Sequence, residues 1–117
     1  MKKNSVDAQV RKVLRKALNL VRAGWTRGAD ARTARGQIVV VHDPRAARFC
    51  SVGALRRAAR RVDGARVTEI YLRALNLVKG CASVEPFFDL SSFNDDPTTT
   101  KGDVIKAFEG ALKLVSR

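Results

Sequence analysis

Apolar residues recur at helical spacing in four separate parts of the chain, and this periodicity constrains the fold more than any other feature of the sequence. Each such segment has one apolar side that must be covered, and helices that share this need pack together around a common core. The predicted helices cover residues 6–23, 44–62, 67–79 and 100–115. At 117 residues the chain is long enough to bury this core as one domain, residues 1–117.

Capping signals support two of these helix starts. Asp43-Pro44 resembles an N-cap followed by proline at the first helical position. Thr100 and Asp103 resemble a capping box, with aspartate in place of the usual glutamate. The long connection at 81–97 contains three aromatic residues that are expected to dock it on the core: Phe87, Phe88 and Phe93.

A short β-hairpin is predicted between the first and second helices. The segment 37–41, with its β-branched run, is the only strong strand signal in the chain, and 29–32 is its expected partner. Residues 33–36 form the turn, with Gly36 supplying a positive φ. An isolated hairpin is marginally stable in water, so this one should lie against the helices. The predicted fold class is therefore mainly α (α+β), a compact four-helix domain with a β-hairpin inserted between helices 1 and 2.

Positive charge is concentrated in the first half of the chain. The net charge is +12 at pH 7. Residues 1–61 carry 16 Lys/Arg against 3 Asp/Glu, whereas residues 62–117 carry 7 against 8. Such an imbalance is typical of proteins that bind nucleic acid, an anionic membrane or an acidic protein. A basic solvated face without a partner would have the same composition.

The arginines that could form a binding surface belong mainly to the first two predicted helices. Guanidinium groups match the geometry of phosphate oxygens, and a patch of them binds nucleic acid with a strong salt dependence. Helices 44–62 and 67–79 could form a helix-turn-helix, but the second offers few side chains able to read bases, so contact with the backbone is the preferred form. The predicted binding residues are Arg11, Arg15, Arg45, Arg48, Arg56, Arg57, Arg60 and Arg61.

Cys50 is the candidate nucleophile. It lies near a predicted helix N-terminus and beside Arg48, two features that lower the pKa of a thiol. The only histidine, His42, could act as its base, and Asn94 or Asp95 could orient that base. The alternative is that Cys50 packs in the core, because cysteine is among the most buried residue types.

Other classes of site have little support in the sequence. One histidine and two separated cysteines do not have the spacing of a zinc site, and the phosphate-binding patterns GxxxxGK[ST] and GxGxxG do not occur, so no metal and no cofactor are expected. No apolar run approaches the roughly 20 residues of a membrane helix. The N-terminus does not read as a signal peptide, and the absence of a CxxC pair favours reduced thiols. A cytoplasmic location is therefore expected.

Three short blocks of sequence resemble a known family. They read WTRGADAR at 25–32, FCSVGAL at 49–55 and FND at 93–95. They are similar to the blocks WTxGxxAR, WCxxGAL and WND of a family of short, uncharacterised bacterial and phage proteins, with Phe49 and Phe93 where that family has tryptophan. The resemblance extends from Trp25 to the C-terminal helix. It implies no activity, because none is known for the family.

The functional prediction is a small, basic, non-enzymatic binding protein that contacts the nucleic-acid backbone through an Arg/Lys-rich helical face. The alternative is a protein-interaction or inhibitor protein, of a phage or mobile-element type, that docks on an acidic partner surface. Cysteine-dependent catalysis at Cys50 ranks third. The partner is thus expected to be nucleic acid, bound without sequence preference, or an acidic protein, and not a membrane.

Overall fold

The computed structural model describes residues 5–60, 62, 66–82 and 89–115 of the chain. Within these residues the elements are helices α1 (Val6–Ala23), α2 (Ser51–Ala59), α3 (Val67–Cys81), α4 (Leu90–Asp95) and α5 (Lys101–Val115), with strands β1 (Ala31–Thr33) and β2 (Ala46–Phe49). The fold is mainly helical, with a small two-stranded antiparallel sheet between α1 and α2. The predicted fold class is confirmed.

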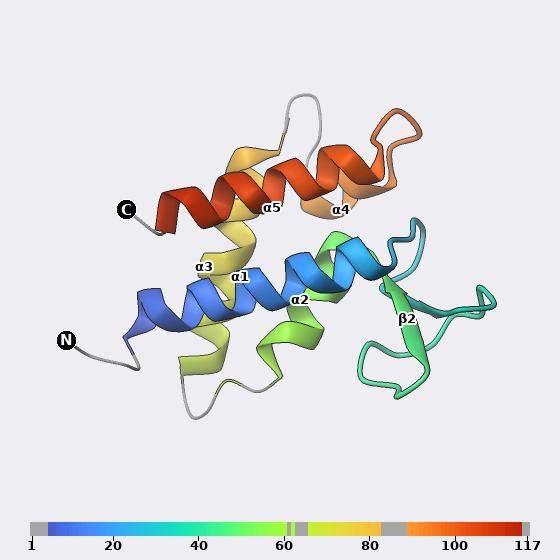
Figure 1. Ribbon diagram of the computed structural model, residues 1–117, viewed down its shortest axis with the longest axis horizontal. Helices are drawn as coiled ribbons and strands as arrows, with labels where there is room; N and C mark the ends of the chain where they lie inside the picture. The colour runs from blue at the N-terminus through green and yellow to red at the C-terminus, as the bar shows by residue number, and fades with distance from the viewer. Residues whose placement is uncertain (1–4, 61, 63–65, 83–88, 116–117) are drawn as a thin grey trace.

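α1 is the central helix of the packing. It runs beside α5 in the opposite direction, while α3 crosses behind both of these helices and α2 packs against α1 (Figure 1). Its apolar stripe is fully inside, and Val10, Leu14 and Val21 are each 0% exposed. Ser5 caps the helix, because its Oγ accepts a hydrogen bond from the N–H of Ala8 at 3.2 Å. The amphipathic pattern therefore reports the true core-facing side of this helix.

The second strand is not where the sequence predicts it. β1 pairs with β2, with Ala31 opposite Phe49, and the segment 37–41 is not a strand. The predicted turn does form, since the N–H of Thr33 donates to the carbonyl of Gln37 at 2.8 Å and Gly36 has φ of 90°. Residues 37–39 consequently lie along the outer edge of β1 through one isolated bridge.

Tertiary packing explains the exchange of strands. Phe49 is 2% exposed, and its N–H donates to the carbonyl of Gly24 at 2.9 Å, which ties β2 to the end of α1. Ile38 and Val40 instead remain largely exposed. Burying an aromatic ring removes more apolar surface from water than burying either aliphatic side chain, so the higher β-propensity of 37–41 does not decide the pairing.

The second helix begins later than predicted. Asp43 does not cap a helix; its Oδ1 accepts from the N–H of Arg45 at 2.8 Å, and its carbonyl accepts from Ala46 at 3.0 Å, which forms a turn before β2. The helix starts at Ser51, with Cys50 as its N-cap, and ends at Ala59 rather than near residue 62. The residues between 44 and 50 are needed to build β2, so the predicted helix start at Pro44 is wrong.

The C-terminal part follows the prediction closely and adds one short helix. Thr100 and Asp103 form the predicted capping box: the N–H of Asp103 donates to Thr100 Oγ1 at 3.1 Å, and the N–H of Thr100 donates to Asp103 Oδ2 at 2.9 Å. α4 forms within the predicted connection 81–97, and its Phe93 is 4% exposed, as expected for a docking aromatic. Phe87 and Phe88 lie outside the described residues. In the described part of the chain, no helix is long and apolar enough to cross a membrane.

Candidate functional site

The three sequence blocks at 25–32, 49–55 and 93–95 meet around Asn94. Its side-chain oxygen accepts three hydrogen bonds, from Trp25 Nε1 at 2.8 Å, from the N–H of Ser51 at 2.9 Å and from Ser51 Oγ at 2.7 Å. Its amide nitrogen donates to the carbonyl of Thr26 at 3.1 Å and to Asp95 Oδ1 at 3.0 Å. Asn94 is 0% exposed, and every hydrogen-bonding position of its amide is used.

Asp95 and Arg27 extend this network toward the surface. Asp95 Oδ1 also accepts from the N–H of Gly28 at 3.0 Å. The guanidinium of Arg27 lies 4.7 Å from the centre of the Trp25 ring and donates to the carbonyl of Thr99. The network joins the loop after α1 to the start of α2 and to α4, and it holds these segments in one arrangement. The members of this network bond to one another, which is typical of a structural role. We call the network around Asn94, with Trp25 and Ser51, the hub.

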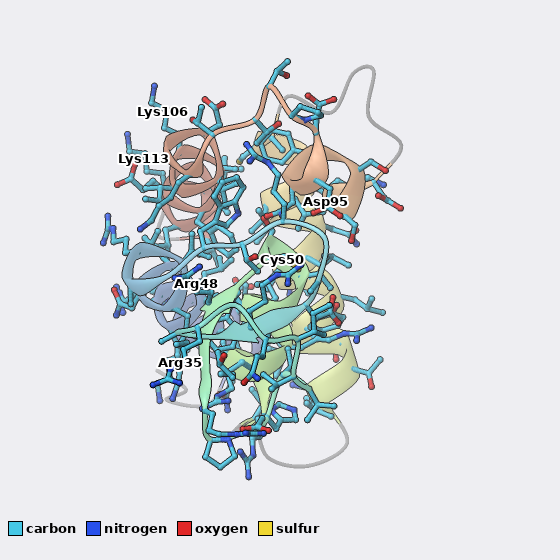
Figure 2. The ribbon with its side chains drawn as sticks, turned by 90° about the vertical axis from the view of Figure 1, so that its right-hand side faces the viewer. Arg35, Arg48, Cys50, Asp95, Lys106 and Lys113 are labelled. Atoms are coloured by element: carbon cyan, nitrogen blue, oxygen red, sulfur yellow. The ribbon has the colours of Figure 1, made fainter. Side chains whose placement is uncertain are left out.

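Cys50 lies next to this hub, near the centre of the view in Figure 2. It is 5% exposed, and its sulfur accepts from the N–H of Gly53 at 3.2 Å and lies 3.7 Å from Asp30 Oδ1. Burial raises the pKa of the Cys50 thiol to about 11, and the negative charge of Asp30 acts in the same direction. The lowered pKa predicted from the helix N-terminus is therefore wrong, because desolvation outweighs the amide bond. Arg48 donates to the carbonyl of Ala34 instead.

Of the other proposed members of a catalytic set, Asn94 is engaged in the hub, and the charge of Asp95 adds to burial in raising the pKa of the Cys50 thiol. The hydrogen bonds described for Cys50 go to Asp30 and Gly53, not to His42. His42 is exposed, and its pKa is lowered by partial burial and by the positive charges of Arg60 and Arg57. Among the residues that the structure describes, no group of three or more His, Cys, Asp or Glu could hold a metal ion.

The thiol environment makes a direct prediction for alkylation. With a pKa near 11, about 0.1% of Cys50 is thiolate at pH 8, so iodoacetamide should modify the more accessible Cys81 first. In a Cys81→Ala variant, modification of Cys50 should accelerate about tenfold per pH unit from pH 8 to pH 10. Mass spectrometry of quenched samples measures both rates. Labelling of Cys50 at pH 8 as fast as a free peptide thiol would contradict the buried geometry.

The predicted binding arginines divide into groups with different surroundings. Arg15 lines a groove between α1 and α5, whereas Arg56 and Arg60 line a groove between α2 and α3. Arg45 pairs with Asp43 at 3.0 Å. Arg11 lies on α1, half-buried, and Arg61 is outside the described residues.

Arg57 is turned toward the protein rather than the solvent. Its Nη1 donates to the carbonyls of Val41 at 2.7 Å and Asp43 at 3.0 Å, and its guanidinium lies 5.7 Å from the centre of the Phe49 ring. It therefore fastens the chain before β2 onto α2. The pattern of charged and apolar residues in the sequence did not indicate that the Arg57 side chain points inward.

One side of the molecule gathers cations from segments far apart in the sequence. Figure 2 shows Arg35 and Arg48 from the sheet region on the same side as Lys106 and Lys113 of α5. Lys113 shares a groove of about 550 Å³ with Arg15. These five residues are called the basic face below. The sequence indicated Arg15 and Arg48 but missed Arg35 and the two lysines, because only the packing of α5 against α1 brings them together.

Carboxylates are few around the basic face. Glu109 lies in the same groove and pairs with Arg22 at 2.9 Å. The pKa of Asp103 is lowered mainly by its hydrogen bonds with Thr100 and in small part by the charge of Lys106. In the described part of the chain, Arg15, Arg35 and Arg48 have no ion pair with a carboxylate. The positive charge of this side is thus mostly uncompensated.

Comparison with known proteins places the chain in a family. A family model described as a family of unknown function, DUF6197, matches residues 5–114. No curated protein matches the chain, and no solved structure does.

Proposed function

The chain belongs to DUF6197, a family of unknown function, and we propose that it is a non-enzymatic protein that binds the nucleic-acid backbone through the basic face. We also infer that the blocks at 25–32, 49–55 and 93–95 are features of the family, since they build the hub around Asn94. A nucleic-acid ligand implies a cytoplasmic location, and the two unpaired cysteines fit a reducing compartment.

The observation that carries the proposal is the gathering of uncompensated cations on one side by α1, the sheet and α5 (Figure 2). Phosphate groups are attracted by charge and need no exact geometry. Cations spread over separate rigid elements can therefore contact successive phosphates of a nucleic-acid backbone. Among the described residues, Asn19 is the only uncharged polar side chain that lines the groove with Arg15 and Lys113, so this groove offers few means of reading bases. Binding without sequence preference follows.

The test is the affinity for generic duplex DNA and RNA over a salt series, measured by fluorescence anisotropy. We expect micromolar affinity at low salt, and the logarithm of the binding constant should fall by about 0.9 per contacted phosphate for each tenfold rise in salt. The double variant Arg15→Gln/Lys113→Gln should weaken binding and reduce the magnitude of this slope by up to about 2.

A matched control removes the same charge elsewhere. Arg66 and Arg73 on or next to α3 are exposed and paired with Glu69 and Asp7. Arg66→Gln/Arg73→Gln lowers the net charge equally but leaves the basic face intact, so the salt slope should stay close to that of the wild type. Equal losses in the two double variants would indicate attraction by net charge alone. Absence of binding to any nucleic acid at low salt would refute the proposal.

A further inference from the structure

An exposed aliphatic pair lies beside a hollow that the basic face does not include. Ile38 and Val40 are 67% and 74% exposed. They alternate with Val39, whose N–H donates to the carbonyl of Ala31 at 3.2 Å, and with Val41, which is 8% exposed. The segment lines a hollow of about 530 Å³. An exposed apolar patch rimmed by polar residues is a feature of interaction sites.

A second hollow continues this surface. It has a volume of about 330 Å³, lies between α2 and α3, and has apolar walls from Ala59, Val67 and the ring of Tyr71. Arg56 and His42 line both hollows. The two apolar hollows are therefore joined at a basic centre.

The basic centre can accept a carboxylate. Arg56 donates to Asp30 Oδ2 at 3.1 Å and lines the second hollow together with Tyr71, and the ion pair holds its guanidinium while leaving other donors of the fork available. Arg56 is also exposed, as are Arg60 and His42. Arg60, within the described residues, has no ion pair with a carboxylate. A preorganised arginine beside a second, uncompensated one suits bidentate recognition of an acidic group.

We propose that this surface, Ile38–His42 with Arg56, Arg60 and Tyr71, binds an extended segment of a partner protein in which an acidic residue lies between apolar ones. The acidic side chain would reach the guanidinium groups, and apolar side chains on either side would enter the two hollows. Arginine and tyrosine beside an apolar patch are the composition typical of protein interfaces. The surface shares no residue with the basic face, so the inference does not depend on nucleic-acid binding.

A protein segment fits this surface better than nucleic acid does. Most of the apolar lining is aliphatic, from Ile38, Val40 and Val67, whereas bases stack on aromatic rings. The carboxylate of Asp30 lies within the first hollow and would repel a run of phosphates. A single acidic residue can bind at Arg60, which lines the second hollow and not the hollow that contains Asp30, and so meets less of that repulsion.

The probe is a display library of short random peptides selected against the immobilised protein. Wild-type protein should enrich peptides with Asp or Glu flanked by aliphatic or aromatic residues. A selected peptide should bind at least about tenfold more weakly to Ile38→Thr/Val40→Thr and to Arg60→Gln, and replacing its acidic residue by the corresponding amide should have a similar effect. The exchanged side chains are exposed, and thermal melting should confirm that the variants fold.

Two controls place the binding on this surface. Leu72→Gln removes another exposed aliphatic side chain, 45% exposed on α3, and should leave peptide affinity unchanged. Arg15→Gln/Lys113→Gln should leave peptide affinity unchanged while it weakens nucleic-acid binding. Tyr71 is the only tyrosine of the chain, so its ring signals in NMR should shift on addition of the peptide.

Three results would overturn the inference. One is the absence of any enriched peptide motif, and another is equal enrichment by the wild type and Ile38→Thr/Val40→Thr. The third is a shift of the Tyr71 ring signals by single-stranded oligonucleotides and not by selected peptides, which would assign the surface to nucleic acid. Each of these can occur while the basic face still binds duplex DNA, so failure of one proposal is distinguishable from failure of the other.

Discussion

Gly53→Ala should destabilise the protein by about 3 kcal/mol or more, although alanine is the better helix former. A Cβ at this position would lie 1.9 Å from the carbonyl oxygen and 2.7 Å from the carbonyl carbon of Asp30. Neither atom can move easily, because the same carbonyl accepts the N–H of Cys50 at 3.2 Å at the start of α2. The helix would have to separate from the loop before β1, and that contact is part of the core. Urea denaturation followed by circular dichroism measures the loss.

A second glycine supplies the control for this prediction. Gly80 lies near the end of α3, and nothing comes within 4 Å of a Cβ added there. Gly80→Ala should therefore leave stability unchanged or raise it by up to about 1 kcal/mol. If Gly53→Ala also stayed within about 1 kcal/mol of the wild type, the close approach of α2 to Asp30 would be contradicted.

The helices could be predicted from sequence because their evidence is local. Periodicity located α1, α3 and α5, and the capping chemistry of Thr100 and Asp103 fixed the start of α5. Each of these signals lies within the segment that forms the helix or directly beside it. The turn at 33–36 was also predicted from local evidence, because position 36 has a positive φ and glycine adopts this conformation readily.

The sheet could not be predicted in the same way, because its pairing is decided by burial. The best strand former, 37–41, competes with 46–49 for the same partner, and Phe49 decides the outcome by entering the core. The error in the start of α2 has the same origin, since a strand at 46–49 and a helix from Pro44 exclude each other. Local propensity was correct for neither segment.

The candidate site shows the same division between local and long-range information. The sequence correctly placed Cys50 near the start of a helix. Its burial, however, depends on Asp30 and on tertiary packing that no local pattern reports. The resemblance singled out Trp25 and Asn94 as parts of blocks without showing that they touch. A buried asparagine bonded to a tryptophan 69 residues away is a property of the folded chain alone.

Asn94→Ala should reduce the free energy of unfolding by about 3 kcal/mol. The exchange leaves the Ser51 hydroxyl, the Ser51 N–H and Trp25 Nε1 without their common acceptor, and each buried polar group left unpaired costs about 1–3 kcal/mol, partly relieved by relaxation or water. Chemical denaturation measures the change. Trp25, the only tryptophan, reports it locally, because its indole N–H signal in NMR should move. Ser91→Ala, at an exposed position of the same helix, should change stability by less than about 0.5 kcal/mol.

Asn94→Asp separates the hydrogen-bonding role of Asn94 from its volume. The new side chain keeps an acceptor for Trp25 and Ser51 but places a second oxygen against the carbonyl of Thr26 and the carboxylate of Asp95, where the amide donated. Burial and the neighbouring carboxylate should raise the pKa of the new acid in the folded protein. The folded state then binds the extra proton more tightly than the unfolded state does, so stability relative to the wild type should rise as the pH falls from 8 to 5. If Asn94→Asp were as stable as the wild type throughout pH 5 to 8, Asn94 would matter through its packing volume and not through its two donated hydrogen bonds.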